Sequence, residues 1–180
     1  NTTNANNNST NTNTNTTNSN NTAIITNNNN IVYRVGFGNE SISERLSDKQ
    51  KTDILKKMHT CLLHYIDKIH FSGEFPEFMN IAYTNLRSKH ALVYSEKQKQ
   101  FVATLANELF TEVINTRLDE IHGMYEEHKD KLNTKTDERL NTFFSDINDK
   151  PEKYQTALEN VKMMAYNNRS KIDTGNLITK

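Results

Sequence analysis

Apolar residues recur along the chain with two different periods, which separate strands from helices. Over residues 31 to 38 every second residue from Ile31 to Phe37 is apolar, and Gly36 and Gly38 end the stretch, so it is expected to form a strand. Ser47 opens a capping box that Gln50 completes. Apolar side chains then recur at three- and four-residue steps, which predicts a helix over about 48 to 69 with one buried face.

Three short apolar segments in the middle of the chain predict a small sheet. They are IAYT at 81 to 84, ALVYS at 91 to 95 and QFVAT at 100 to 104, each bounded by polar turns. Short connections join strands that lie side by side, so we expect an antiparallel three-strand meander. The strand over 31 to 37 is a candidate fourth strand of this sheet.

In the C-terminal part of the chain, apolar residues recur only at the three- and four-residue steps of helices. Helices are predicted over about 106 to 131, over about 136 to 147, and from Pro151 onward, because proline suits the first turn of a helix. The predicted fold class is therefore α+β: a strand, a helix, a small antiparallel three-strand meander, and then C-terminal helices.

The first of these helices has the heptad spacing of a coiled coil over nearly three heptads. Such a seam packs either inside its own domain or against the same helix of another chain, and both alternatives stay open. The residues that would carry self-association are Ile114, Leu118, Ile121 and Tyr125.

Composition divides the chain into three parts. Residues 1 to 30 hold fifteen Asn, nine Thr and no charge, so this low-complexity tract is expected to be a disordered tether. Residues 31 to 172 are long enough for one globular domain with its own core, and 173 to 180 are expected to be a flexible tail. The chain begins at Asn rather than Met, so we expect it to be the C-terminal part of a longer protein.

Charge and cysteine content exclude several classes of protein. The 22 basic and 22 acidic residues cancel, so the broad positive field of a strong non-specific DNA binder is absent. A single cysteine, Cys61, excludes a disulfide framework and a cysteine zinc site within this chain. The sequence shows no signal peptide and no membrane-spanning run, so we expect a protein that is not secreted and does not contact a membrane.

The segment from His70 to Arg87 invites a catalytic interpretation. His70 and Asn80 resemble part of a His-metal nuclease site, but His70 closes a predicted helix, and no second ligand pair follows at helical spacing. A degenerate metal-dependent nuclease is therefore a distant alternative. We predict a structural loop, and no catalytic residue, metal ligand or cofactor.

Basic residues gather in and after the turns of the predicted sheet and offer a second hypothesis. A local patch beside tyrosines would make the domain a nucleic-acid-binding accessory domain. The residues expected to contact nucleic acid are Arg87, Lys89, Lys97, Lys99 and Arg169.

Short motifs in a fixed order resemble a known group of proteins. Residues 32 to 40 read VYRVGFGNE, 69 to 81 read IHFSGEFPEFMNI, 84 to 89 read TNLRSK and 166 to 169 read YNNR. Together they resemble a domain of uncharacterised proteins from giant, mimivirus-like viruses, which often follows a Cys2His2-type zinc finger. The resemblance implies a viral protein in the host cytoplasm (the viral factory) or in the virion. We therefore expect a non-enzymatic interaction or oligomerisation domain, whose partner is itself or another viral protein.

Overall fold

The structure is a computed structural model that describes residues 23–25 and 31–172. Most of the predicted tether over 1 to 30, and the predicted tail over 173 to 180, lie outside these residues. Within the tether, β1 (Ala23–Ile25) pairs antiparallel with β2 (Ile31–Tyr33). The expected strand at 31 to 38 is thus shorter than predicted, and it joins β1 instead of the meander. After Tyr33 the chain leaves the strand, and the Val35 N–H donates to the Glu77 carbonyl at 2.9 Å.

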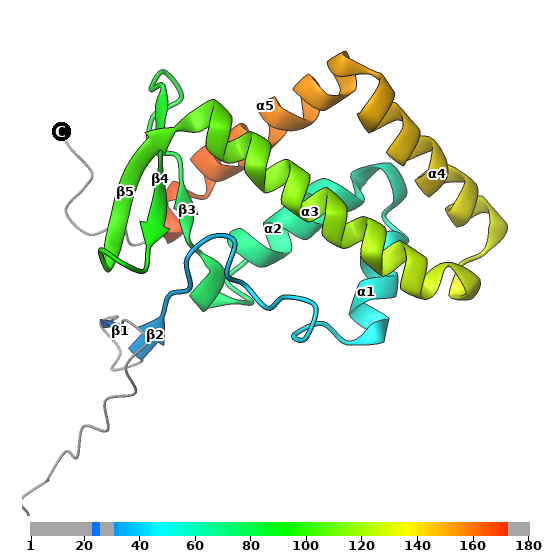
Figure 1. Cartoon of the computed structure of the whole chain (residues 1–180), viewed down its shortest axis with the longest axis horizontal. Coiled ribbons are helices and arrows are strands. Elements are labelled where there is room, and N and C mark those ends of the chain that lie inside the picture. Colours follow the sequence, from blue (N-terminus) through cyan, green and yellow to red (C-terminus); the bar gives the residue numbers. More distant parts are fainter. Residues whose placement is uncertain (1–22, 26–30, 173–180) are drawn as a thin grey trace, which may run out of the picture.

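The predicted meander is present, and the fold class is α+β as expected. Its strands are β3 (Ile81–Ala82), β4 (His90–Ser95) and β5 (Gln100–Leu105), in the order β3-β4-β5. Both pairings are antiparallel, and β4 and β5 are in register over their full lengths. This sheet lies at one end of the domain, and the long helices extend away from it (Figure 1).

The helix predicted over 48 to 69 is broken into two. α1 (Asp48–Leu55) begins with the expected capping box at Ser47, and η1 (Met58–Thr60) then leads into α2 (Cys61–His70). Met58 takes a left-handed backbone with φ of 53° although it is not glycine. No glycine or proline marks this break, so periodicity alone predicted a single helix. The break turns α1 and α2 into different directions (Figure 1), so that α1 packs on α3 while α2 packs on both α3 and α5.

Three helices complete the chain close to their predicted bounds. α3 (Ala106–His128) starts directly after β5 and ends in η3 (Lys129–Lys131). α4 (Thr134–Asp149) and α5 (Pro151–Asn167) meet at Lys150 and diverge from that corner (Figure 1), and η4 (Arg169–Lys171) ends the described part. A single hydrophobic core runs from the inner side of the sheet between α1, α2, α3 and α5. Apolar side chains at the predicted helical spacing supply most of it.

Candidate functional site

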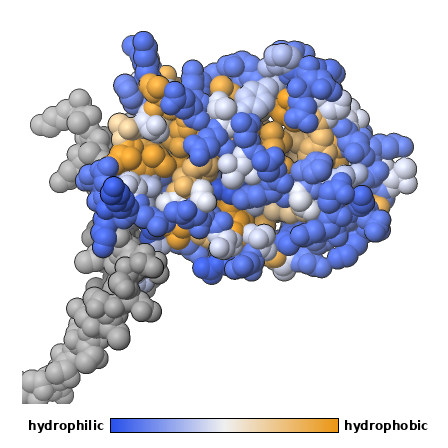
Figure 2. All heavy atoms as spheres, in the orientation of Figure 1, coloured by the Kyte–Doolittle hydropathy of each residue, from blue (hydrophilic) through white to orange (hydrophobic). Residues whose placement is uncertain are grey.

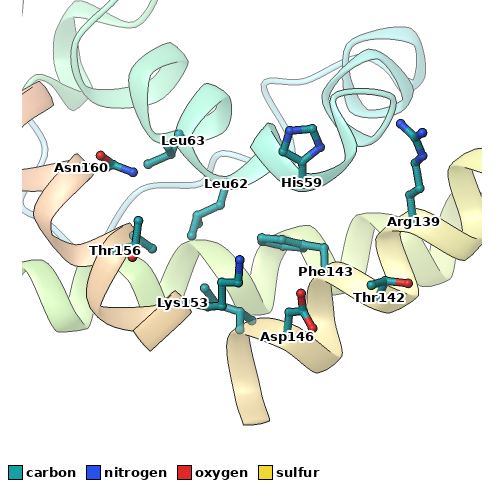
Figure 3. A pocket seen from close by; sticks show the side chains of 12 residues that line it. His59, Leu62, Leu63, Arg139, Thr142, Phe143, Asp146, Lys153, Thr156 and Asn160 are labelled. Atoms are coloured by element: carbon teal, nitrogen blue, oxygen red, sulfur yellow. The ribbon is translucent and has the colours of Figure 1, made fainter. Parts of the chain in front are cut away.

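A groove opens between α2, α4 and α5, with a volume of about 580 Å³. This is within the range of roughly 300–1,000 Å³ that is typical of ligand sites. Figure 3 shows the side chains that surround it. The groove is lined by His59, Leu62, Leu63, Arg139, Thr142, Phe143, Asp146, Ile147, Lys153, Thr156, Ala157 and Asn160.

The floor of the groove is apolar and its rim is polar. Leu62, Ile147 and Ala157 are buried, and Leu63 and Phe143 are half-buried. Most of the polar lining residues are exposed, so the groove is an open surface feature with an apolar base. A site of this kind buries the apolar part of a ligand and leaves polar contacts to orient it.

The two lining stripes on α4 and α5 have the same helical spacing. On α4 the lining residues stand at 139, 142, 143, 146 and 147, and on α5 they stand at 153, 156, 157 and 160. Steps of three, four and seven residues place each set on one face of its helix. The stripes cover eight helical steps on α4 and seven on α5, or about 10 to 12 Å along the helix axis. The groove is therefore elongated and about two helical turns long.

Positive charge at the rim exceeds negative charge. The Asp146 carboxylate is bound by Lys150, with Oδ1 and Nζ 2.6 Å apart. Arg139 Nη1 contacts only the sulfur of Met58, at 3.8 Å, and no carboxylate of the described residues lies within 4.0 Å of Arg139 or Lys153. Two cations thus lie beside an apolar floor without a counter-ion from the described part of the chain.

Backbone strain is found next to this groove. Met58, with its left-handed backbone, immediately precedes the lining residue His59 and contacts Arg139. A non-glycine residue in this region costs of order 1–3 kcal/mol and persists where the surrounding structure fixes it. Such strain clusters at ligand sites, which favours this groove as a functional feature.

The second polar cluster of the molecule is buried and has Arg117 of α3 at its centre. The Arg117 side chain is fully buried, with Nη2 3.2 Å from Glu40 Oε2 and Nη1 2.6 Å from Glu120 Oε1. Nε donates to His70 Nε2 at 3.2 Å. Burial alone would lower the pKa of Arg117, but the carboxylates of Glu120 and Glu40 raise it above its ordinary value. The guanidinium therefore stays charged inside the domain.

Glu40 is the buried counter-ion of this arginine, and its side chain is 1% exposed. Its carboxylate accepts hydrogen bonds from the Gly38 N–H and from Asn80 Nδ2, both at 2.7 Å. Asn80 Nδ2 also donates to the Val35 carbonyl at 3.0 Å. These contacts join the loop over 35–40 to the start of the sheet and to α3.

His70 uses both ring nitrogens inside this buried network. Arginine can only donate, so Nε2 accepts from Arg117, and the proton must sit on Nδ1. Nδ1 then donates to the Phe78 carbonyl at 3.0 Å and to Asn80 Oδ1 at 3.1 Å. Burial, with the charge of Arg117 beside it, lowers the pKa of His70 to about 3. The ring is neutral at neutral pH and keeps no free lone pair for a metal or for general-base catalysis.

The structure therefore brings His70 and Asn80 together, as a nuclease site would require. Here the two side chains hold a loop in place by hydrogen bonds inside the core. His70 ends α2, as expected, and the loop that follows it is anchored through Phe78 and Asn80. Arg117 and Glu40 were not singled out as site residues in the sequence. Arg117 lies three residues after Ile114 and four before Ile121, so its place among buried positions was the one available signal.

The residues predicted to carry self-association lie mostly in the core of the single chain. Ile114 and Ile121 are 0% exposed, Tyr125 is 7% exposed, and Leu118 packs against the core as a half-buried residue. Packing within one chain is enough to explain their heptad spacing. Self-association through this seam stays a prediction, which the oligomeric state would test.

The residues predicted to contact nucleic acid are divided between separate places. Arg87 and Lys89 lie in the β3–β4 connection, whereas Lys97 and Lys99 lie in the β4–β5 turn at the opposite end of β4 (Figure 1). Six strand residues, about 20 Å, separate the two turns. Arg169 lies in η4, and its guanidinium stacks on Tyr166 at 4.0 Å. The two turns do not form one patch, and nucleic-acid binding stays a prediction that salt-dependent binding would test.

The described residues show neither a metal-binding cluster nor a membrane-spanning helix, and comparisons with known proteins identify no family. Among the described residues, no group of three or more His, Cys, Asp or Glu side chains is placed to hold a metal ion. None of the helices in that part of the chain is both long and apolar enough to cross a membrane. Comparisons with models of known protein families, with curated proteins and with solved structures found no match.

Proposed function

We propose that this domain is a non-enzymatic interaction domain whose groove binds an acidic amphipathic segment of a partner protein. The observation that carries the proposal is the pair of cations, Arg139 and Lys153, which lie without a carboxylate partner among the described residues beside an apolar floor. An acidic partner would supply the missing counter-ions and cover the floor at the same time. The resemblance to giant-virus proteins stays a prediction, and the proposal does not depend on it.

The shape of the groove favours a helical or extended segment about two turns long. Two lining stripes with the same helical spacing flank a floor of about 10 Å, which suits apolar anchors at positions i, i+3 or i+4, and i+7 of the segment. Acidic side chains on either side of the anchors would then meet Arg139 and Lys153. A contact of this size lies below about 1,200 Å² of buried surface, so we expect weak, transient binding.

The chemistry of the lining supports binding without catalysis. The hydroxyl groups of Thr142 and Thr156 donate to carbonyls of their own helices, at 2.9 and 2.7 Å, so neither proton is held by a base. Asp146 is bound by Lys150. A nucleophile needs a neighbouring base within hydrogen-bond reach, and the described contacts of the groove contain no such pair.

Selection from a random peptide display library tests this proposal with a defined probe. We expect the full chain to enrich peptides that combine acidic residues with apolar residues at helical spacing. The double variant R139E/K153E should lose them, because it reverses both unpaired charges. The matched control R87E/K89E reverses two exposed charges in the β3–β4 connection and should bind as the unmodified chain does.

Two results would overturn the proposal. One is a selection that enriches no acidic amphipathic sequence. The other is enriched peptides that bind R139E/K153E as well as they bind the unmodified chain. Circular dichroism of each variant confirms that a loss of binding is not a loss of folding.

A further inference from the structure

β5 is an edge strand whose outer main-chain groups can be assigned. The Tyr94 N–H donates to the Asn80 carbonyl at 2.8 Å, so the main chain of Tyr94 points toward β3, and that of its neighbours Val93 and Ser95 points toward β5. These two residues lie opposite Val102 and Gln100. Main-chain groups alternate along a strand, so the N–H and C=O groups of the odd-numbered residues 101, 103 and 105 point away from the sheet.

None of the usual protections of an edge strand is found in β5. Its sequence, QFVATL, holds no charged residue and no proline, and it pairs with β4 without a bulge. Leu105 is 45% exposed, and Ala103 is exposed as well. Figure 1 shows no labelled helix or strand beyond β5, and Figure 2 shows hydrophobic residues gathered on this side of the molecule. Within the part of the chain that the structure describes, no element covers this uncharged edge, and such an edge is a template for pairing with another strand.

We propose that β5 pairs antiparallel with β5 of a second copy of this chain, around a two-fold axis at Ala103. This register places Ala103 opposite itself and Phe101 opposite Leu105, so all three outward-facing residues form hydrogen-bonded pairs. About six main-chain hydrogen bonds result, two for each such pair. The exposed Leu105 side chain gains Phe101 of the second copy as its cross-strand neighbour.

Charge complementarity favours a second copy as the occupant. In this register the β4–β5 turn, which ends just before Gln100, lies beside the start of α3 of the second copy, which follows Leu105 and holds Glu108 in its first turn. The basic β4–β5 turn, with Lys97 and Lys99, thus comes to lie beside the acidic first turn of α3. None of these three charged residues has an ion-pair partner among the described residues. The strand itself holds no charge, so no like charges meet at the axis.

Pairing through β5 joins the two sheets into one sheet of six strands in the order β3-β4-β5-β5-β4-β3. α4, which supplies one wall of the groove, lies at the opposite end of the molecule from β5 (Figure 1). Both grooves therefore stay open in the dimer. Two weak sites held together bind a partner with two acidic segments far more tightly than one site does.

Light scattering after size exclusion, over a concentration series of the full chain, tests the pairing. We expect a dimer that dissociates on dilution. A103K should be a monomer, because it brings two ammonium groups face to face at the axis, whereas the matched variant A103T should remain a dimer. An equimolar mixture of A103K and A103E should restore a dimer of one chain of each kind.

Two outcomes overturn this inference. One is an unmodified chain that stays monomeric up to its solubility limit. The other is a dimer that A103K leaves intact, which would place the contact elsewhere, for example at the α3 seam. A monomer that still binds acidic peptides would leave the proposed function standing, so the two ideas fail separately.

Discussion

The buried network around Arg117 and the rim of the groove are built from the same kinds of side chain, and they differ in whether their charges are paired. In the buried network, Arg117 contacts two carboxylates and a histidine, and its side chain is fully buried. In the groove, Arg139 and Lys153 are exposed and lack a carboxylate partner among the described residues. Arg117 thus has its counter-ions within the chain, whereas Arg139 has none among the described residues.

We infer from this difference that the buried network contributes to stability and that the groove is available for recognition of a partner. A buried charge is tolerated only when its partners satisfy it, so each member of the network depends on the others. An exposed charge costs little in isolation and remains available to a ligand. Substitutions in the network should therefore change the free energy of unfolding, and substitutions in the groove should change binding instead.

The largest difference is expected between the two arginines. R117M removes the buried cation and leaves the buried Glu40 carboxylate without its counter-ion, so it should lower the free energy of unfolding by about 3–5 kcal/mol. R139M should change it by less than about 0.5 kcal/mol, because the side chain is exposed. Urea denaturation of both variants measures the two effects. Similar values for the two would show that the network does not hold the fold together.

A smaller effect is expected from acid. The folded pKa of His70 is about 3, below its ordinary value of 6.5, so between these two values the unfolded chain binds a proton that the folded chain does not. Stability should therefore fall as the pH is lowered from 6.5. Between pH 6.5 and pH 5 this one histidine accounts for about 1.6 kcal/mol, because the full slope of about 1.4 kcal/mol for each pH unit is reached only below pH 6.5.

Unfolding of H70Q as a function of pH measures that contribution. Glutamine does not titrate, so the loss of stability between pH 6.5 and pH 5 should be smaller in H70Q by that amount. The matched variant H59Q replaces an exposed histidine outside the buried network and controls for the exchange of histidine for glutamine. An unchanged slope in H70Q would mean that His70 takes up a proton in the folded state.

The smallest difference is expected between two hydroxyl groups. The Tyr65 hydroxyl donates to Glu120 Oε2 at 2.8 Å, and the residue is 0% exposed. A hydrogen bond to a charged group contributes roughly 1.5 kcal/mol, so Y65F should lower the free energy of unfolding by about that much. T156V removes a hydroxyl at the groove rim and should stay within about 0.5 kcal/mol of the unmodified chain. Equal stability of Y65F and the unmodified chain would remove Tyr65 from the network.

The sequence was sufficient for most of the fold because the periods of its apolar residues are regular. The meander, α3, α4 and α5 lie within a few residues of their predicted bounds. The break at Met58 was not predictable, because no glycine or proline marks it, yet Met58 takes a left-handed backbone. The pairing of β2 with β1 was missed because the tract around Ala23 reads as low-complexity.

The candidate site was far less accessible from sequence. The groove is formed by residues that are far apart in the chain, and only the arrangement of the helices in space brings Lys153 and Arg139 to one rim. His70 and Asn80 were identified as a pair, but their partners Arg117 and Glu40 are distant in the chain. Contacts between segments so far apart leave no local pattern that a sequence can show.

Chemical-shift mapping tests most directly whether the groove is the binding site. An acidic amphipathic peptide from the display selection would be titrated into the isotope-labelled full chain. We expect shifted amides along the lining faces of α4 and α5, with residues near Arg139 and Lys153 among the largest, and no loss of the buried Arg117 contacts. Shifts confined to β5 or to the β3–β4 and β4–β5 turns would contradict the account and place the binding surface on the sheet.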